Sequence, residues 1–102
     1  MLAFWVGVLL TAQSRWMYHL HMCENPENIP SVIDSNGLRS YGKYQWQMRS
    51  WLNYGFLGAT RENISDDAVQ DKVTKWVLDH EGTSKWYNCS KIVTRRYGSY
   101  SN

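Results

Sequence analysis

The carboxyl group with the most unusual predicted surroundings in this sequence belongs to Glu24. Apolar residues keep helical spacing between positions 9 and 23, and Pro26 ends that helix just beyond the glutamate. Glu24 is therefore expected at the C-terminal end of a helix, next to apolar surface. The helix dipole and the loss of water both disfavour a negative charge there and raise the pKa of the carboxyl. A carboxyl that keeps its proton near neutral pH can act as a general acid, and the alternative is an ordinary solvated glutamate.

The chain next carries a run of small, amide and aromatic residues, SYGKYQW (residues 40–46). An amide can hydrogen-bond to polar groups of a ligand, and aromatic rings can stack on sugars or bases, or fill a core. Side chains alternate along an extended chain, so Tyr44 and Trp46 share one face and Gln45 takes the other. We expect Gln45 and Tyr41 to face the carboxyl across a groove, with one or both of the aromatic neighbours of Gln45 in the core.

The elements that would position these residues are mainly helical. The best-marked helix spans residues 65–82, where Ser65 can cap the start. Asp66 and Asp67 then lie in the first turn, where the helix dipole favours negative charge. Gly82 supplies the end of the helix. The apolar stripe of this helix consists of Val69, Val73, Trp76 and Val77.

Shorter segments complete the expected fold. Residues 24–37 form a loop that ends in an Asn-Gly turn, and residues 38–46 form a short strand or extended segment. Residues 47–55 can form a short helix, and residues 86–102 are a polar, aromatic and irregular segment. The fold class predicted is mainly α (α+β), with one small extended patch. The short helix would place Met48, Trp51 and Leu52 on one face, with Trp51 in the core.

Composition limits the classes of function. The chain has 102 residues, which is enough for one domain. Its net charge of +2 is too mild for a nucleic-acid-binding domain, which usually carries a concentrated basic patch. The cysteines and histidines match no metal-binding spacing, and the chain has no Gly-rich phosphate loop. We therefore expect no metal, no cofactor and no nucleic-acid partner.

The two cysteines, Cys23 and Cys89, are most simply used in a disulfide, and the alternative is two buried free thiols. Closing so long a loop contributes roughly 4 kcal/mol to the free energy of unfolding in the chain-entropy model. A disulfide implies an oxidising compartment. It also requires Cα atoms about 4.4–6.8 Å apart, which would bring the C-terminal segment beside the helix end at Glu24.

The N-terminal residues 1–14 are apolar and then polar. The run is too short for a membrane-spanning helix, so no stable membrane span is expected. It is similar to the apolar core of a secretory signal, with Ala12 and Ser14 at a cleavage point, but it lacks a basic start. The alternative is the first half of a helix that reaches Cys23. The expected organisation is a signal or helix start at 1–14, a domain at 15–93 and a polar tail at 94–102.

Taken together, these residues resemble the lysozyme-like superfamily, most closely its soluble lytic transglycosylase and phage or bacterial muramidase branch. In that branch the catalytic Glu ends a helix, and a Gly-x-x-Gln-aromatic segment follows, which residues 42–46 fit. The resemblance covers roughly residues 16 to 91. The stretches that carry it are Cys23-Glu24, Asp34 to Gly37, Ser40 to Trp46, Trp51, and Trp86 to Cys89 after the long helix.

The chain departs from the pattern of this branch directly after the glutamate. The branch usually reads Glu-Ser-Gly, and its Ser helps to orient the Glu, whereas this chain has Asn25-Pro26. This departure leaves the expected fold unchanged and puts full activity in question.

The resemblance implies a lysozyme-like domain with helices around a groove, which cleaves the MurNAc-GlcNAc glycan strand of peptidoglycan with Glu24 as general acid and base. A lytic transglycosylase needs this single carboxyl, because the 6-hydroxyl of the sugar attacks and gives a 1,6-anhydro product. A hydrolytic muramidase usually needs a second carboxylate, for which Asp34 is the candidate; the alternative is that Asp34 only shapes the turn. The substrate-binding residues would be Ser40, Tyr41, Gly42, Tyr44, Gln45, Trp46 and Trp86.

The resemblance also implies a monomer that is secreted, periplasmic or extracellular, or associated with a phage particle. Two rival functions remain. The fold could be a glycan-binding module that has lost catalysis, as the change at Asn25-Pro26 allows. It could also be a small structural protein of a virion or secretion apparatus, anchored by its apolar N-terminus.

Overall fold

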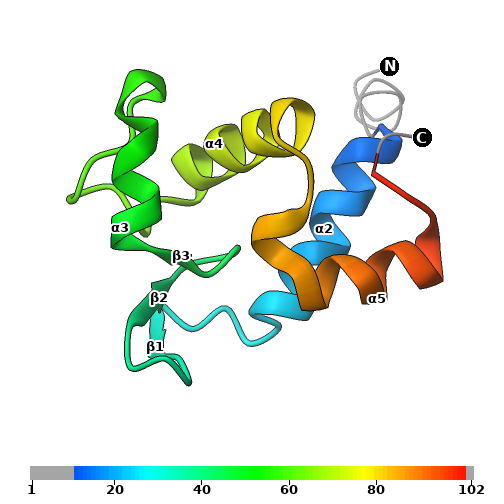
Figure 1. Ribbon diagram of the computed structural model, residues 1–102, viewed down its shortest axis with the longest axis horizontal. Helices are drawn as coiled ribbons and strands as arrows, with labels where there is room; N and C mark the ends of the chain where they lie inside the picture. Colours follow the sequence, from blue (N-terminus) through cyan, green and yellow to red (C-terminus); the bar gives the residue numbers. More distant parts are fainter. Residues whose placement is uncertain (1–10, 101–102) are drawn as a thin grey trace, which may run out of the picture.

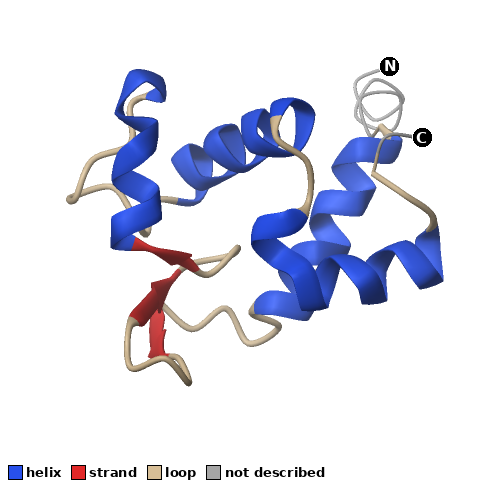
Figure 2. Ribbon diagram, viewed as in Figure 1, coloured by secondary structure: helices blue, strands red, loops and turns tan. Residues whose placement is uncertain are grey.

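The computed structural model of the protein describes residues 11–100. Helices make up most of this part, and a small antiparallel sheet lies at one end of it (Figures 1 and 2). The expected mainly α (α+β) class is confirmed. In chain order the elements are α2 (Ala12–Glu24), β1 (Ser31–Ile33), β2 (Arg39–Tyr41), β3 (Trp46–Gln47), α3 (Met48–Trp51), the 3-10 helix η1 (Leu52–Leu57), α4 (Asp67–His80), the 3-10 helix η2 (Ser84–Trp86) and α5 (Tyr87–Tyr97).

Helix α2 ends where the sequence predicted. Thr11 caps its start, because the Thr11 hydroxyl accepts a hydrogen bond of 2.9 Å from the backbone N–H of Ser14. Glu24 is the last helical residue, and the backbone N–H of Asn25 closes the final turn on His21. Residues 1–10, which include most of the expected signal or helix start, lie outside the described residues, so the division of the chain at 14 and 93 stays a prediction. None of the helices within residues 11–100 is long and apolar enough to cross a membrane.

The small sheet has the order β1-β2-β3, with both pairs antiparallel. Strand β1 lies in the segment that we expected to be a loop, so that prediction is wrong. Its β-branched residues Val32 and Ile33 pair with Ser40 and Arg39 of β2, and such pairing can form a strand that local sequence does not announce. The turn between β1 and β2 is the predicted one, with Gly37 in the left-handed conformation at φ +82°.

Helix α4 differs from the prediction only in its first residues. Asp66, and not Ser65, is the N-cap: its backbone is extended and its carboxylate accepts the N–H of Val69 at 3.0 Å. Val73 and Val77 of the predicted apolar stripe are fully buried, and Val69 and Trp76 are half-buried. Beyond the last turn, Gly82 has a φ of +89°, as expected for a helix-ending glycine.

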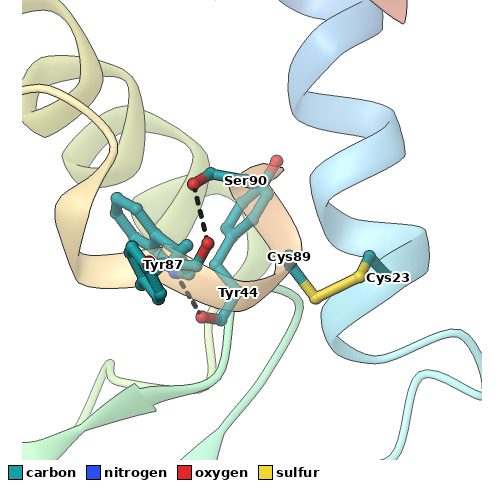
Figure 3. The surroundings of a disulfide bond; sticks show 6 residues. Cys23, Tyr44, Tyr87, Cys89 and Ser90 are labelled. Carbon is teal, nitrogen blue, oxygen red and sulfur yellow. Dashed lines mark hydrogen bonds between the residues drawn. A yellow bond between two sulfur atoms is a disulfide. The ribbon is translucent and has the colours of Figure 1, made fainter. Parts of the chain in front are cut away.

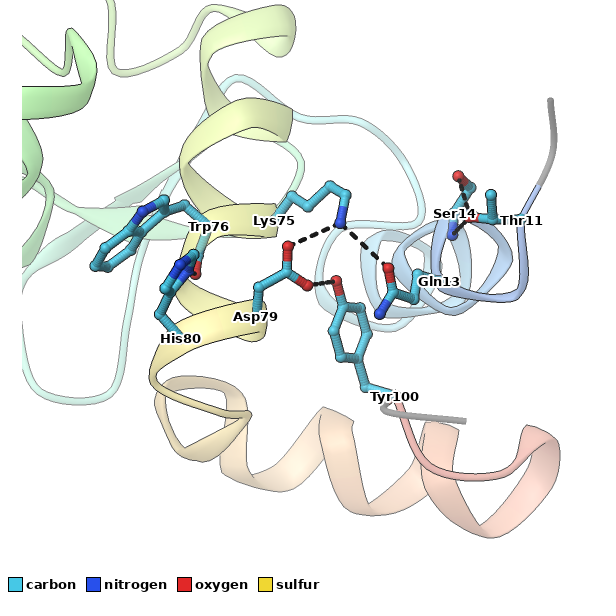
Figure 4. A network of polar contacts seen from close by, with 8 residues as sticks. All are labelled: Thr11, Gln13, Ser14, Lys75, Trp76, Asp79, His80 and Tyr100. Atoms are coloured by element: carbon cyan, nitrogen blue, oxygen red, sulfur yellow. Dashed lines mark hydrogen bonds and ion pairs between the residues drawn. The ribbon is translucent and has the colours of Figure 1, made fainter.

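The C-terminal segment is not irregular, and this prediction is wrong. Residues Tyr87–Tyr97 form helix α5, which packs against α2 (Figure 1). Its core-facing residues Cys89 and Val93 are one turn apart, and a disulfide fixes the first of them to α2. Beyond α5, Tyr100 is buried and donates a hydrogen bond of 2.6 Å to Asp79 of α4 (Figure 4).

The disulfide joins Cys23 in the last turn of α2 to Cys89 in the first turn of α5 (Figure 3). The Cα atoms are 5.8 Å apart, within the range that we expected. The bridge therefore holds the end of α2, where Glu24 lies, against the C-terminal helix.

The aromatic core is centred on Trp46. Its ring meets those of Trp51, Tyr54 and Trp86 edge-to-face, with centroids 5.3 to 5.4 Å apart. The core position of Trp51 is confirmed, because this side chain is fully buried. Leu52 was predicted to share its face, but 41% of Leu52 is exposed. The α-helix ends at Trp51 and the chain tightens into η1, which turns Leu52 outward.

Candidate active site

A pocket of about 340 Å³ lies where the end of α2, the small sheet and η2 meet. Side chains that come from separate parts of the sequence therefore share one space. Six of the residues singled out in the sequence line it: Glu24, Asp34, Ser40, Gln45, Trp46 and Trp86. Three further lining residues were not predicted: Gln47, Ser50 and Lys85.

Glu24 is half-buried at the C-terminal end of α2 and lines the pocket. Burial raises the pKa of this carboxyl from its usual 4.5 to about 7, and the nearby charge of Asp34 adds to the increase. The direction agrees with the effect expected from an apolar helix end. At neutral pH a substantial fraction of Glu24 keeps its proton, as a general acid requires.

Asp34 lines the same pocket and also shapes the turn after β1. Its backbone N–H donates to Leu38 and its carbonyl accepts from Gly37. Its side-chain oxygen Oδ2 accepts hydrogen bonds from the buried hydroxyl of Ser40 and from Nε2 of Gln47, the latter at 3.0 Å. The two uses of Asp34 that the sequence left open are thus compatible, because the backbone forms the turn while the carboxylate is fixed in the pocket wall.

Gln45 reaches the pocket from a tight turn between β2 and β3. Its backbone is left-handed, with a φ of +55°, and its N–H and its side-chain Nε2 both donate to the carbonyl oxygen of Gly42, at 3.2 and 2.9 Å. Among residues 11–100, no hydrogen bond uses the side-chain oxygen of Gln45, which leaves this acceptor for a ligand.

Trp46 and Trp86 give the pocket an apolar wall. Both are nearly fully buried, and both indole N–H groups already have partners: Trp46 donates to the hydroxyl of Thr74 at 2.9 Å, and Trp86 donates to the carbonyl of Tyr44 at 2.8 Å. These two side chains can therefore offer a ligand only the small part of each that is exposed in the pocket, and no hydrogen-bond donor.

Tyr41 and Tyr44 do not line this pocket. Ser40 points inward to Asp34, so the next side chain along β2, Tyr41, lies on the opposite side, beside Leu38 in a separate pocket. Tyr44 is buried, lines a third pocket and donates its hydroxyl to Asp71 at 2.8 Å. The expected placement of Tyr41 across from Glu24 is therefore not observed.

Two buried amides that the sequence analysis missed hold the turn that carries Gln45. The first is Asn25, which directly follows Glu24 and is 4% exposed. Its Nδ2 donates to the carbonyls of Ile29 and Gly42, at 2.8 and 2.9 Å, and its Oδ1 accepts the N–H of Ile29 at 2.9 Å. This amide therefore fixes the loop after α2 through Ile29 and connects the end of α2 to the hairpin turn through Gly42.

The second amide is Gln70 of α4, which is fully buried on the other side of the same turn. Its Oε1 accepts the N–H of Tyr44 at 3.0 Å, and its Nε2 donates to the carbonyl of Tyr41 at 2.7 Å. A Cβ atom on Gly42 would collide with this Nε2, so a larger residue there would have to displace the buried amide of Gln70, and the left-handed backbone also favours glycine. Gln70 lies on the apolar stripe of α4, and a glutamine in such a position is a sequence signal that could have identified it.

In residues 11–100, no three His, Cys, Asp or Glu side chains come together in a way that could hold a metal ion. The site as described therefore consists of a half-buried acid, a fixed carboxylate, an amide and two indole rings. This set can donate a proton, stabilise positive charge and contact a ring-shaped ligand.

Comparison with known protein families agrees with this arrangement. The family model of the transglycosylase-like domain matches residues 11–89, from the cap of α2 to the second cysteine of the disulfide. No curated protein and no solved structure gives a significant match. Because the family model covers well over half of the chain, the protein belongs to the transglycosylase-like domain family.

Proposed function

We propose that the protein is a peptidoglycan-cleaving glycosidase, a lytic transglycosylase or muramidase, that acts on the MurNAc-GlcNAc strand with Glu24 as its general acid and base. Membership of the transglycosylase-like domain family supports a glycosidase at the level of the family. The observation that carries the assignment to Glu24 is its position: it lies half-buried in the pocket with a pKa raised to about 7.

In the first step, Glu24 donates its proton to the glycosidic oxygen. The bond from this oxygen to the anomeric carbon breaks, and the sugar becomes an oxocarbenium-like centre. In the second step, the Glu24 carboxylate takes a proton from the attacking hydroxyl group. That hydroxyl is either the 6-hydroxyl of the same sugar, which gives a 1,6-anhydro product, or water, which gives a hydrolysed product.

The other pocket residues support this reaction in separate roles. The carboxylate of Asp34, held by Ser40 and Gln47, can stabilise the positive charge of the oxocarbenium-like centre or orient water. The free side-chain oxygen of Gln45 can accept a hydrogen bond from the sugar. The small exposed parts of Trp46 and Trp86 can make apolar contact with the sugar. We assign Gly42 and Tyr44 to the turn and Tyr41 to the opposite side of β2, so that none of the three contacts the substrate directly.

The departure at Asn25-Pro26 is compatible with this function. In the branch that the chain resembles, a serine after the catalytic glutamate helps to orient it. Here Asn25 anchors the same helix end, because its side chain bonds to Ile29 and Gly42. We propose that this anchoring replaces the contribution of the serine. The peptidoglycan substrate and the disulfide fit a location outside the cytoplasm, which we propose is secreted, periplasmic or extracellular.

Clearing of purified cell walls by the wild-type protein, by Glu24→Gln and by Glu62→Gln tests the proposal. Glu24→Gln keeps the shape of the side chain and removes the proton, so we expect it to abolish clearing. Glu62 is exposed and lies outside the pocket, so Glu62→Gln should clear walls like the wild type. Co-sedimentation of the wild-type protein with walls that it does not clear would instead identify a glycan-binding module.

Mass analysis of the products separates the two reactions. A 1,6-anhydro product is lighter than the hydrolysed product by one water molecule.

In the clearing test, near wild-type clearing by Glu24→Gln would contradict the assignment of Glu24 as the catalytic acid.

A further inference from the structure

Lys85 is the one cationic side chain among the described residues that line the Glu24 pocket. It lies in η2, directly before Trp86, and is exposed, whereas both carboxylates of the pocket, Glu24 and Asp34, are half-buried. A lysine at this position adds a compact, strongly hydrated positive charge to the solvent-facing part of the site.

Within residues 11–100, the charge of Lys85 has no acidic partner. The lysines that do form ion pairs there are Lys43, with Asp71, and Lys75, with Asp79, and neither of these lysines lines the Glu24 pocket. The Nζ atom of Lys85 lies 5.6 Å from the ring centroid of Tyr54, a contact that positions the ammonium without neutralising it.

None of the acidic groups around Lys85, which are Glu81, Asp34 and Glu24, forms an ion pair with it. The hydroxyl of Tyr54 donates to Glu81 at 2.6 Å, and Glu81 is not paired with Lys85. Asp34 is held by Ser40 and Gln47. The pKa of Glu24 is raised, whereas an ammonium close to its carboxyl would lower it. Lys85 is therefore placed to meet a negative charge that comes with the substrate.

We propose that Lys85 binds a carboxylate of the glycan substrate and makes the site prefer anionic strands over otherwise identical neutral ones. This inference rests on the proposed function and specifies the substrate that the same pocket selects. Peptidoglycan strands offer this chemistry in two places. The lactyl group of MurNAc is a free carboxylate in strands without peptides, and the stem peptide brings carboxylates of its own in strands that carry it.

Two variants test the proposal, Lys85→Met and Lys91→Met. Methionine keeps much of the apolar stem of lysine and removes its charge. Lys91 is a matched control, because it is also exposed, also lies over a tyrosine ring, at 4.8 Å from the centroid of Tyr87, and lines a different pocket. A loss of positive charge from the C-terminal part of the chain is thus common to both variants, and only Lys85→Met changes the Glu24 pocket.

Three preparations of glycan strands serve as substrates: peptide-free strands, the same strands with their lactyl carboxylates converted to methylamides, and strands that carry stem peptides. On strands that carry the carboxylate bound by Lys85, we expect Lys85→Met to raise KM roughly threefold to tenfold and to change kcat little. This range is typical of a charged contact that is exposed or partly desolvated. On the methylamide strands, Lys85→Met and wild type should not differ. Lys91→Met should behave like the wild type throughout.

The pattern of effects identifies the carboxylate. A rise in KM on the peptide-free strands points to the lactyl group, and a rise confined to peptide-bearing strands points to the stem peptide. The proposal is overturned if Lys85→Met raises KM on the methylamide strands as much as on both other preparations. It is also overturned if Lys85→Met raises KM on none of the three preparations. A shift of the pH profile of kcat on every substrate overturns it too, because Lys85 would then act on the charge of Glu24.

Binding measurements keep this test independent of catalysis. The affinity of wild type and Lys85→Met for peptide-free, methylamide and peptide-bearing strands can be measured by calorimetry on the Glu24→Gln background. If the wild-type protein cleaves none of the strands, the proposed function fails, while a selective loss of affinity in Lys85→Met still supports carboxylate binding. Equal affinities in all combinations overturn it.

Discussion

Asn25 and Gly42 are joined by a hydrogen bond of 2.9 Å from the side-chain Nδ2 of Asn25 to the carbonyl oxygen of Gly42. The same oxygen accepts two hydrogen bonds from Gln45, one from its backbone and one from its side chain. A single carbonyl therefore connects the residue after Glu24 to the residue that reaches the pocket from the hairpin turn. The relative position of the acid and the amide depends on this connection.

Replacement of Asn25 by alanine should lower both stability and activity. The change removes the acceptor of the part-buried N–H of Ile29 and one of the donors to the Gly42 carbonyl, and each lost hydrogen bond typically costs about 0.5–1.5 kcal/mol. Thermal unfolding measures the first effect and kcat/KM on cell-wall strands the second. Asn36→Ala is a useful control, because Asn36 is also an asparagine in hydrogen-bonded turn structure but is exposed. Equal unfolding temperatures of wild type and Asn25→Ala would contradict the role of this amide.

Replacement of Gly42 by alanine should destabilise the protein more than replacement of Gly37. Both glycines are left-handed, with φ of +72° and +82°, so both variants lose about 1–2 kcal/mol to backbone strain. Only at Gly42 does the new Cβ also collide with the buried amide of Gln70, whereas nothing lies within 4 Å at Gly37. Denaturant unfolding of the two variants compares the two positions. A Gly42→Ala variant as stable as Gly37→Ala would show that Gln70 can move aside.

The parts of the fold that the sequence predicts correctly are those with local signals. Pro26 ends α2 next to Glu24, and Gly82 follows the end of α4. Strand β1 and helix α5 were missed because their partners are distant: β1 pairs with β2, and α5 is fixed to α2 by the disulfide and by packing. Local propensity alone cannot report such contacts.

The sequence also predicted some residues of the candidate site correctly and missed others. Glu24 and Asp34 lie in one pocket, and the sequence had picked out both. Simple alternation along a strand failed for Tyr44, Gln45 and Trp46, because the chain makes a tight turn at Gly42 and Gln45, both left-handed. Lys85 has no local signal at all, since an exposed lysine before a tryptophan is common and only the folded chain brings it to the pocket.

Removal of the disulfide should lower the free energy of unfolding by roughly 4 kcal/mol. Its cysteines are 66 residues apart, and without the bridge the unfolded chain regains the conformational entropy of that loop. The double variant Cys23→Ser, Cys89→Ser, studied by denaturant unfolding beside the oxidised wild type, measures the loss. Activity should fall with it, since Cys23 immediately precedes Glu24. The wild-type protein in reductant should match the double variant, and an unchanged unfolding midpoint would argue against a stabilising bridge.

Replacement of Asp34 by asparagine should move the alkaline limb of the pH profile of kcat/KM to lower pH. The charge of Asp34 helps to raise the pKa of Glu24, so its removal lets Glu24 lose its proton at a lower pH. Asparagine keeps an oxygen to accept from Ser40 and Gln47. Glu27→Gln, which removes an exposed charge that does not contribute to the raised pKa of Glu24, should leave the limb in place. An unmoved limb in Asp34→Asn would show that burial alone sets the pKa.

The raised pKa of Glu24 also predicts how stability depends on pH. The pKa of the carboxyl is about 7 in the folded protein and near 4.5 when it is exposed on unfolding, so between these values the folded state binds more protons. Stability contributed by Glu24 is therefore lost as the pH rises from about 4.5 to 7, by roughly 1–3 kcal/mol in total. Glu24→Gln is neutral at every pH and escapes this loss. The unfolding temperatures of Glu24→Gln and wild type are measured from pH 4 to 8. The value for Glu24→Gln minus that for wild type should increase between about pH 4.5 and 7 and then stay constant. A constant difference across the window would mean that Glu24 ionises at its usual pKa and is not the buried acid of the site.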